Sequence, residues 1–543
     1  MIERIAELAR ALAVLLAASQ AVATLLNHDT SDILESKPTN EHASMKAFLI
    51  KARDMQQPLL AMMDQIRTTL NAARQQCYQV APINRLPDEI LIQIFHSPPF
   101  TRDDIHKYRQ SNAILVSSVC HRWRQLATQT GSLWSTIHFQ KPLTHHSITG
   151  DRIDRLGLSE ADEFLNVARL CLQRSNDCGL EIIFGDIHHM STELFTAAVD
   201  LVLPAFSRWE ALEFNGWICD EDQMHQVLSG FLNCCYQNPS QSLRLQSFHF
   251  IRACKRTPDS LEKKLLAILD IAPIRSLELG AIKPVLPASV AQSLTYLSLE
   301  RCYDEMNITP LDLDMVLRQC TRLRSIKINR VDIRDGSLPV TMPTKVILPH
   351  LEEIFLVQSG PTFTPMFIYQ NVVASSLESF VILVPGTSNS DQEAQRLLYD
   401  AMVSFLGSTP SIRSFTYANL PGTHLANALR VLPQLITLTF GLGEYSWDYV
   451  GQMTFVPPPL EVCPQLAELQ IDTRETNVFS GIFGLVALKH FLEARSTLPG
   501  VVPLRALTIK YGLEHLQAGY GEELLVLKEW FSSRVELVWK NVG

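Results

Sequence analysis

The stretch LTYLSLERC, residues 294–302, places leucine at its first, fourth and sixth positions. Side chains alternate between the two faces of a β-strand, so Leu297 and Leu299 point to one side of such a strand. Ser298 and Glu300 point to the other side. The frame apolar-x-x-apolar-x-apolar therefore predicts a short strand with one buried face and one open face.

Ten further runs of the chain keep this frame, at intervals of 20 to 38 residues. Between them lie segments with helical apolar spacing, such as Leu261, Leu265 and Leu269. A strand followed by a helix, when repeated, gives parallel strands on one side and helices on the other. Because one unit cannot bury its apolar face alone, the units are expected to stack. The ten runs are WEALEF (209–214), LQSFHF (245–250), IRSLEL (274–279), LRSIKI (323–328), LEEIFL (351–356), LESFVI (377–382), IRSFTY (412–417), LITLTF (435–440), LAELQI (466–471) and LRALTI (504–509).

These runs resemble leucine-rich repeats. In residues 294–302, leucines and a final cysteine fill that family's frame L-x-x-L-x-L-x-x-(Asn or Cys). The resemblance implies an irregular solenoid over residues 180–543. Helical spacing around Leu527 and Phe531, followed by alternation through Leu537 and Trp539, indicates a C-terminal cap. A doubly wound α/β domain is the alternative fold.

A second informative stretch reads INRLPDEILIQIFHSPPF at residues 83–100 and, after a polar insert, ILVSSVCHRWRQLATQTGSLWSTIHF at residues 114–139. Its apolar residues recur at helical spacing. They are too many and too large for so small a unit to bury alone. The stretch therefore predicts short helices that present a surface to a partner.

Residues 81–140 resemble the F-box, the adaptor-binding module of SCF-type ubiquitin ligases. The resemblance rests on LPDEIL at residues 86–91, the pair Ile94-Phe95, the core Val119-Cys120-x-x-Trp123 and the closing Leu133-Trp134. It implies that this segment docks an Skp-type adaptor and, through it, a cullin. The residues implied to form the adaptor-binding face or its supporting core are Leu86, Pro87, Ile90, Leu91, Ile94, Phe95, Val119, Cys120, Trp123, Leu126 and Trp134.

The predicted fold class is α/β, with N-terminal helices and a helical F-box followed by the repeats. Residues 1–80 are expected to hold helices and a linker, and residues 141–179 a helical connector. Apolar residues from Leu59 to Cys77 follow a heptad rhythm. That segment either packs within the chain or forms a short dimerising coiled coil.

Composition narrows the function classes. A net charge of −9 and a pI near 6 give no basic face for nucleic acid. The eleven cysteines form no CxxC pair, so neither zinc nor a disulfide framework is expected, and reduced thiols favour cytoplasm or nucleus. The apolar run at residues 11–26 is too short to span a bilayer. It is interpreted as a helix, with a secretory signal as the alternative.

Motifs of common catalytic sites are absent from the sequence, including GxSxG, the Walker-type phosphate loop and HExxH. No cofactor or metal is expected. The F-box resemblance implies a substrate-recognition subunit of an SCF-type ubiquitin ligase, and its open strand face is expected to bind a target protein. The alternatives are a scaffold that binds an adaptor without ubiquitin transfer and, more distantly, a secreted repeat receptor. The residues expected to contact a target are Ser298, Glu300, Lys327, Asn329, Phe355, Val357, Gln470 and Asp472.

Overall fold

The structure is a computed structural model of the 543-residue chain. It forms two compact units, Met1–Ser97 and Pro98–Gly543, each described by itself below. The residues that the structure describes are 50–51, 61, 64–65, 67–69, 72, 82–97, 105–139, 158–185, 191–216, 221–252, 259–300, 308–329, 331, 344–357, 363–383, 392–418, 427–441, 463–472, 486, 488–490, 492–493, 495–497, 499–511 and 521–541.

In the first unit, the 3-10 turn η1 (Pro82–Arg85) leads into helix α3 (Asp88–His96). Two acidic residues, Asp88 and Glu89, occupy the first turn of α3, where they complement the helix dipole. The expected helix at residues 11–26 lies outside the described residues, as do all six apolar heptad positions from Leu59 to Cys77.

The second unit opens with helices and then becomes a long sheet. Its helices and 3-10 turns are α4 (Ile105–Val119), α5 (His121–Gln129), η3 (Gly131–Trp134), α6 (Leu158–Arg174), α7 (Thr192–Val202), η5 (Leu203–Arg208), α8 (Glu221–Gln237), α9 (Asp259–Ile271), α10 (Ala288–Ser293), α11 (Pro310–Gln319), α12 (Phe363–Asn371), α13 (Gln392–Gly407) and α17 (Gly521–Ser532). Caps define several of these helices. The side chain of Thr309, for example, accepts from the N–H of Asp312, and the Asp312 carboxylate accepts in return from the N–H of Thr309.

Fourteen described strands form one sheet in chain order, and every neighbouring pair is parallel. A separate parallel pair consists of β8 (Val346–Ile347) and β10 (Val372–Val373). The strands of the long sheet are β1 (Thr136–Phe139), β2 (Leu180–Phe184), β3 (Trp209–Gly216), β4 (Ser247–Arg252), β5 (Ser276–Gly280), β6 (Tyr296–Glu300), β7 (Ser325–Asn329), β9 (Glu353–Val357), β11 (Ser379–Leu383), β12 (Ser414–Ala418), β13 (Thr437–Gly441), β14 (Glu468–Asp472), β15 (Ala506–Tyr511) and β16 (Glu536–Asn541).

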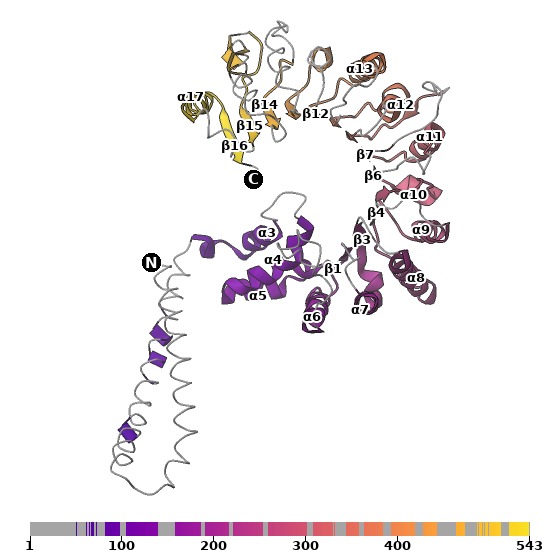
Figure 1. Cartoon of the computed structure of the whole chain (residues 1–543), viewed down its shortest axis with the longest axis vertical. Coiled ribbons are helices and arrows are strands. Elements are labelled where there is room, and N and C mark those ends of the chain that lie inside the picture. Colours follow the sequence, from indigo (N-terminus) through magenta and orange to yellow (C-terminus); the bar gives the residue numbers. More distant parts are fainter. Residues whose placement is uncertain are drawn as a thin grey trace, which may run out of the picture. The chain divides into compact units, whose positions relative to one another are not determined.

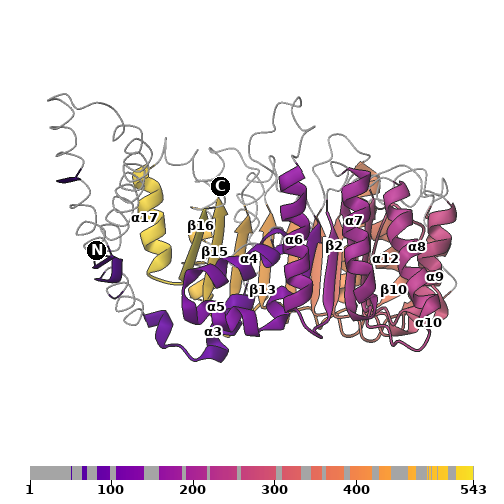
Figure 2. The same cartoon turned by 90° about the horizontal axis from the view of Figure 1, so that it is seen from below.

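The described helices from α6 onward lie along one face of the sheet (Figure 1). Figure 2, turned by 90°, shows the strands side by side with helices in a second layer. We call the sheet face turned away from these helices the open face. A strand alternating with a helix, in chain order and with parallel pairing, is compatible with a solenoid-like α/β repeat.

The strand register determines which apolar side chains form the core. The middle apolar residue of each run lies beside the middle residue of the next, and this column is turned toward the helices. All of its members are buried. The column comprises Leu212, Phe248, Leu277, Leu297, Ile326, Ile354, Phe380, Phe415, Leu438, Leu469 and Leu507.

A strand is present in each of the eleven runs that the sequence analysis singled out. The sheet also begins earlier than residue 180, because β1 lies inside the segment compared with the F-box and pairs with β2. Trp134, Ile137 and Phe139 do keep the apolar frame. Trp134 also closes the F-box resemblance. The residues of this first strand were therefore assigned to the F-box and not to the sheet.

Substitution of the buried column should destabilise the second unit strongly. Phe415 is 0% exposed, and its ring stacks on that of Phe380 with a centroid distance of 5.9 Å. We expect Phe415→Ala to lower the free energy of unfolding by about 3–5 kcal/mol, measured by urea denaturation. Thr416→Ala, on the open face of the same strand, is the matched control and should change it by about 0.5 kcal/mol or less. Equal effects of the two substitutions would contradict this assignment of faces.

Candidate functional site

Helix α3 has two apolar faces with opposite exposure. Leu91 and Phe95, four residues apart, are 0% and 2% exposed. Ile90 and Ile94, also four residues apart, are 40% and 41% exposed. Side chains at this spacing share one face of a helix, so the two isoleucines form an exposed apolar ridge. Pro87, directly before the helix, is exposed as well.

Helix α4 of the second unit presents exposed apolar residues of its own. Ile114, Leu115 and Val119 are 37%, 58% and 44% exposed, whereas Val116 is buried. The guanidinium Nε of Arg124 donates to the carbonyl of Ser117 at 2.9 Å, which connects α5 to α4. Exposed large side chains gathered on one short helix indicate a contact surface for a partner.

Two residues of the F-box resemblance have structural roles. The Cys120 thiol accepts a hydrogen bond from the N–H of Trp123 at 3.5 Å and so caps α5. The indole N–H of Trp134, which is 1% exposed, donates to the carbonyl of Ala127 at 2.7 Å. The Arg174 guanidinium lies 4.4 Å from the Trp134 ring centroid, a cation–π contact from α6.

The expected adaptor-binding residues therefore divide by exposure. Pro87, Ile90, Ile94 and Val119 are exposed and can contact a partner. Leu86, Cys120 and Trp123 are half-buried, while Leu91, Phe95, Leu126 and Trp134 are buried and support the helices. Ile114 and Leu115, which are also exposed, were not predicted as contacts. Their signal is the run Ile-Leu-Val at residues 114–116, which holds more apolar residues than one helix face can bury.

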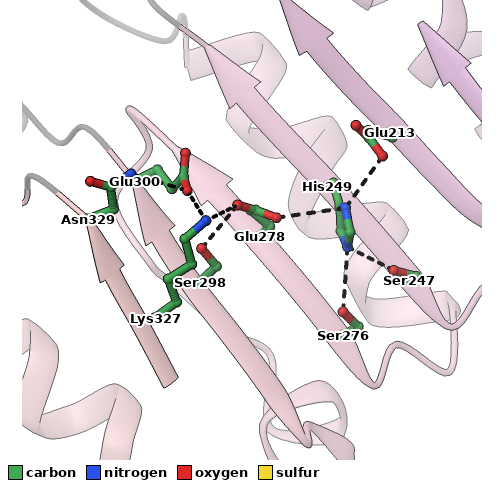
Figure 3. A network of polar contacts seen from close by, with 9 residues as sticks. All are labelled: Glu213, Ser247, His249, Ser276, Glu278, Ser298, Glu300, Lys327 and Asn329. Atoms are coloured by element: carbon green, nitrogen blue, oxygen red, sulfur yellow. Dashed lines mark hydrogen bonds and ion pairs between the residues drawn. The ribbon is translucent and has the colours of Figure 1, made fainter. Parts of the chain in front are cut away.

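A polar network crosses the open face from β3 to β7 (Figure 3). At one end, Nδ1 of His249 lies 3.7 Å from a carboxylate oxygen of Glu213 and 3.8 Å from one of Glu278. These carboxylates come from the two strands that flank β4. On the other side of the ring, Nε2 lies 2.9 Å from Oγ of Ser247 and 3.5 Å from Oγ of Ser276.

At the other end of the network, Lys327 links two carboxylates. Its ammonium pairs with Oε1 of Glu300 and lies 3.5 Å from Oε1 of Glu278. The Ser298 hydroxyl donates to the same Glu278 oxygen at 3.1 Å, and the Asn329 amide donates to Glu300 at 3.4 Å. Glu278 thus joins the histidine end to the lysine end.

The surroundings of His249 favour its charged form. Burial alone would lower the pKa of His249. The nearby carboxylate of Glu213 and the charges of Glu278 and Glu181 outweigh burial and raise that pKa above its ordinary value. Protonated His249 therefore contributes stability to this part of the sheet, and the contribution disappears as the pH rises through the raised pKa.

The pKa values of the two linked carboxylates shift in opposite directions. Burial raises the pKa of Glu278, although the charges of Lys327 and His249 oppose this shift. Burial also disfavours the charged form of Glu300, but hydrogen bonds from Lys327 and Asn329 outweigh it and lower the pKa of Glu300. For Lys327, burial is outweighed by the two carboxylates, so its pKa is raised. The Lys327–Glu300 pair is therefore held in its ionised form.

The residues expected to contact a target differ in how exposed their side chains are. Ser298 is 0% and Glu300 is 7% exposed, because neighbouring strands of the network cover them. The others with described side chains are partly exposed, and the side chain of Asp472 lies outside the described residues. Glu213, His249 and Glu278 were not predicted as site residues. Each stands between the last two apolar positions of its run, which is the signal that could have found them.

Comparison with known proteins gives one family match. Residues 83–140 match the family described as F-box-like. No curated protein gives a significant match. Among solved structures, the chain is similar to a chain in the crystal structure of the Rad7 and Elc1 complex in yeast, at 13% sequence identity and a TM-score of 0.32, covering 77% of this chain and 96% of that one.

Within the described part of the chain, no group of three or more His, Cys, Asp or Glu side chains is placed to hold a metal ion. Among the helices whose residues are described, none combines the length and apolarity needed to cross a membrane.

The position of His249 predicts a pH-dependent stability. Above about pH 6.5, the ordinary pKa of histidine, the stability that His249 contributes should decline with rising pH, because its charge is lost as the pH passes through the raised pKa. The difference in free energy of unfolding between wild type and His249→Gln should therefore shrink as the pH rises, measured by urea denaturation at several pH values. His350→Gln, at an exposed histidine outside the network, is the control. A difference that stays constant with pH for His249→Gln would refute this role.

Proposed function

We propose that this protein is the substrate-recognition subunit of an SCF-type cullin-RING ubiquitin ligase. The observation that carries the proposal is the F-box-like match at residues 83–140, within which Ile90 and Ile94 are exposed on one face of α3. F-box modules bind Skp-type adaptors, which attach to a cullin. Ile90, Ile94 and Pro87 are the residues proposed to contact the adaptor.

We further propose that residues 136–541 are an irregular leucine-rich-repeat solenoid that binds the target protein. Sequential strand order with parallel pairing supports a solenoid over a doubly wound domain, in which the chain order reverses and helices cover both faces. The open face is the surface proposed for the target. It is formed by strands whose backbone register is fixed, so its side chains are held in place before a target binds.

The proposed contribution to ubiquitin transfer is proximity. A receptor that holds a target beside the charged conjugating enzyme turns a bimolecular encounter into a step within one complex. In this scheme the chain supplies no catalytic group and no cofactor. Its place of action is the cytoplasm or nucleus, in keeping with cysteines that form no disulfide framework in the sequence.

Removal of the α3 ridge should abolish tight adaptor binding. Burial of one large aliphatic side chain contributes about 1.5–3 kcal/mol, so the double substitution Ile90→Glu and Ile94→Glu should weaken binding by about a hundredfold or more. The measurement is biolayer interferometry of the full chain with a purified Skp-type adaptor. The matched control is Leu525→Glu with Val526→Glu on α17, where both residues are 59–65% exposed. Unchanged binding by the α3 double variant would refute the proposed docking site.

Ubiquitin transfer separates the receptor from a scaffold that binds an adaptor without transfer. The full chain, incubated with adaptor, cullin, RING subunit, ubiquitin-activating and conjugating enzymes, should be ubiquitinated on its own lysines, as a receptor held near the conjugating enzyme is exposed to it. The double change at Ile90 and Ile94 should remove this modification, as read by immunoblot. Adaptor binding without cullin recruitment or modification would favour the scaffold.

A further inference from the structure

Part of the open face is apolar. We call Phe355 and Val357 of β9 and Val381 and Leu383 of β11 the apolar strip. Phe355 lies beside Val381 and Val357 beside Leu383 in the strand register. All four are partly exposed and alternate with buried residues of the same strands.

The strip has defined neighbours on both sides. Toward β7 it meets Lys327 beside Phe355, which is the end of the polar network, and Asn329 beside Val357. Toward β12 the register continues with the small neutral residues Thr416 and Ala418. The strip is therefore a bounded apolar patch between a charged region and a neutral one.

One edge of the strip is polar and carries an uncovered carboxylate. Glu353, two residues before Phe355 on β9, is exposed and accepts a hydrogen bond from Ser325 at 2.9 Å. The next strands place Ser379 and Ser414 in the same row. This row can accept hydrogen bonds from a partner and attract a positive charge.

Charge on the open face is unbalanced. Among the open-face side chains that the structure describes on strands β3 to β12, carboxylates come from Glu213, Glu278, Glu300 and Glu353, and the one ammonium is that of Lys327. Protonation of His249 reduces this excess without removing it. A cationic partner is therefore favoured near the strip, and an acidic one is opposed.

The spacing of the strip residues matches that of side chains on an extended partner. Along β9 and β11, strip residues are two positions apart, about 7 Å, which is also the spacing of side chains on one face of an extended segment. Exposed apolar patches rimmed by polar residues mark binding surfaces. We infer that the apolar strip binds an extended segment of the target protein whose strip-facing side chains, at every second position, are large apolar residues flanked by Lys or Arg. This inference rests on the proposed target-binding role of the open face.

Four synthetic decapeptides test the two chemical requirements separately. Each has Ser at its even positions. At the odd positions, which share one face of an extended peptide, the Lys-Val peptide carries Lys, Val, Val, Val and Lys. The Glu-Val peptide replaces Lys with Glu, the Lys-Ser peptide replaces Val with Ser, and the Glu-Ser peptide does both. Binding to the full-length chain is measured by fluorescence anisotropy of labelled peptides at physiological ionic strength. The Lys-Val peptide should bind at least about tenfold more tightly than each of the others, because it alone supplies both apolar contact and positive charge.

Substitutions then locate the binding. Phe355→Ser should weaken the Lys-Val peptide by about tenfold, whereas Leu397→Ser, at a 48% exposed residue on α13, is the matched control and should have no effect. Glu353→Lys should reduce the preference for Lys-Val over Glu-Val. Its control is Glu529→Lys on α17, at another exposed glutamate.

Several results would overturn the inference. They are a failure of all four peptides to bind, Glu-Val binding as tightly as Lys-Val, or a Phe355→Ser variant that binds like wild type. A dimer of the full chain in light scattering that Phe355→Ser dissociates would show that a second copy occupies the strip. Adaptor binding, measured on the same preparation, reports on the proposed ligase role separately, because α3 carries that contact and the strip does not.

Discussion

Register between the parallel strands decides which side chains of the sheet are buried and which lie on the open face. Successive repeats align so that Leu297 lies beside Leu277 and Ile326, and the same alignment continues from β3 to β15. A shift of one residue in any strand would turn its buried side chains to the open face. The repeats can differ in length because the number of residues between successive strands varies, while the strands themselves keep the common register.

The same register creates the surfaces proposed for function. Glu213, His249, Glu278, Ser298 and Lys327 occupy equivalent positions of consecutive strands, so separate repeats combine into one polar network. Farther along, that row continues as Phe355 and Val381, and its character changes from charged to apolar. Side chains distant in sequence thus become neighbours through backbone hydrogen bonds alone, and small changes in each repeat can alter the whole surface.

Alternation within a strand was sufficient to predict the eleven runs and to place Leu297 and Leu299 in the core. It assigned Ser298 and Glu300 to the open face but could not show that they are buried there, because their cover comes from Glu278 and Lys327 on other strands. Spacing likewise predicted α3, while the split between exposed Ile90 and buried Leu91 depends on tertiary packing. A single sequence does not show which side chains from other strands or helices will lie beside a given residue.

In the proposed function, adaptor and target bind to separate parts of the chain: helices within residues 83–140 bind the adaptor, and the open face of the sheet binds the target. This division can be tested by hydrogen–deuterium exchange of the full chain, with and without a purified Skp-type adaptor. We expect the adaptor to slow exchange in peptides covering α3 and α4 and to leave exchange in β9 and β11 unchanged. Protection of those strands by the adaptor, or no protection of α3, would contradict this division.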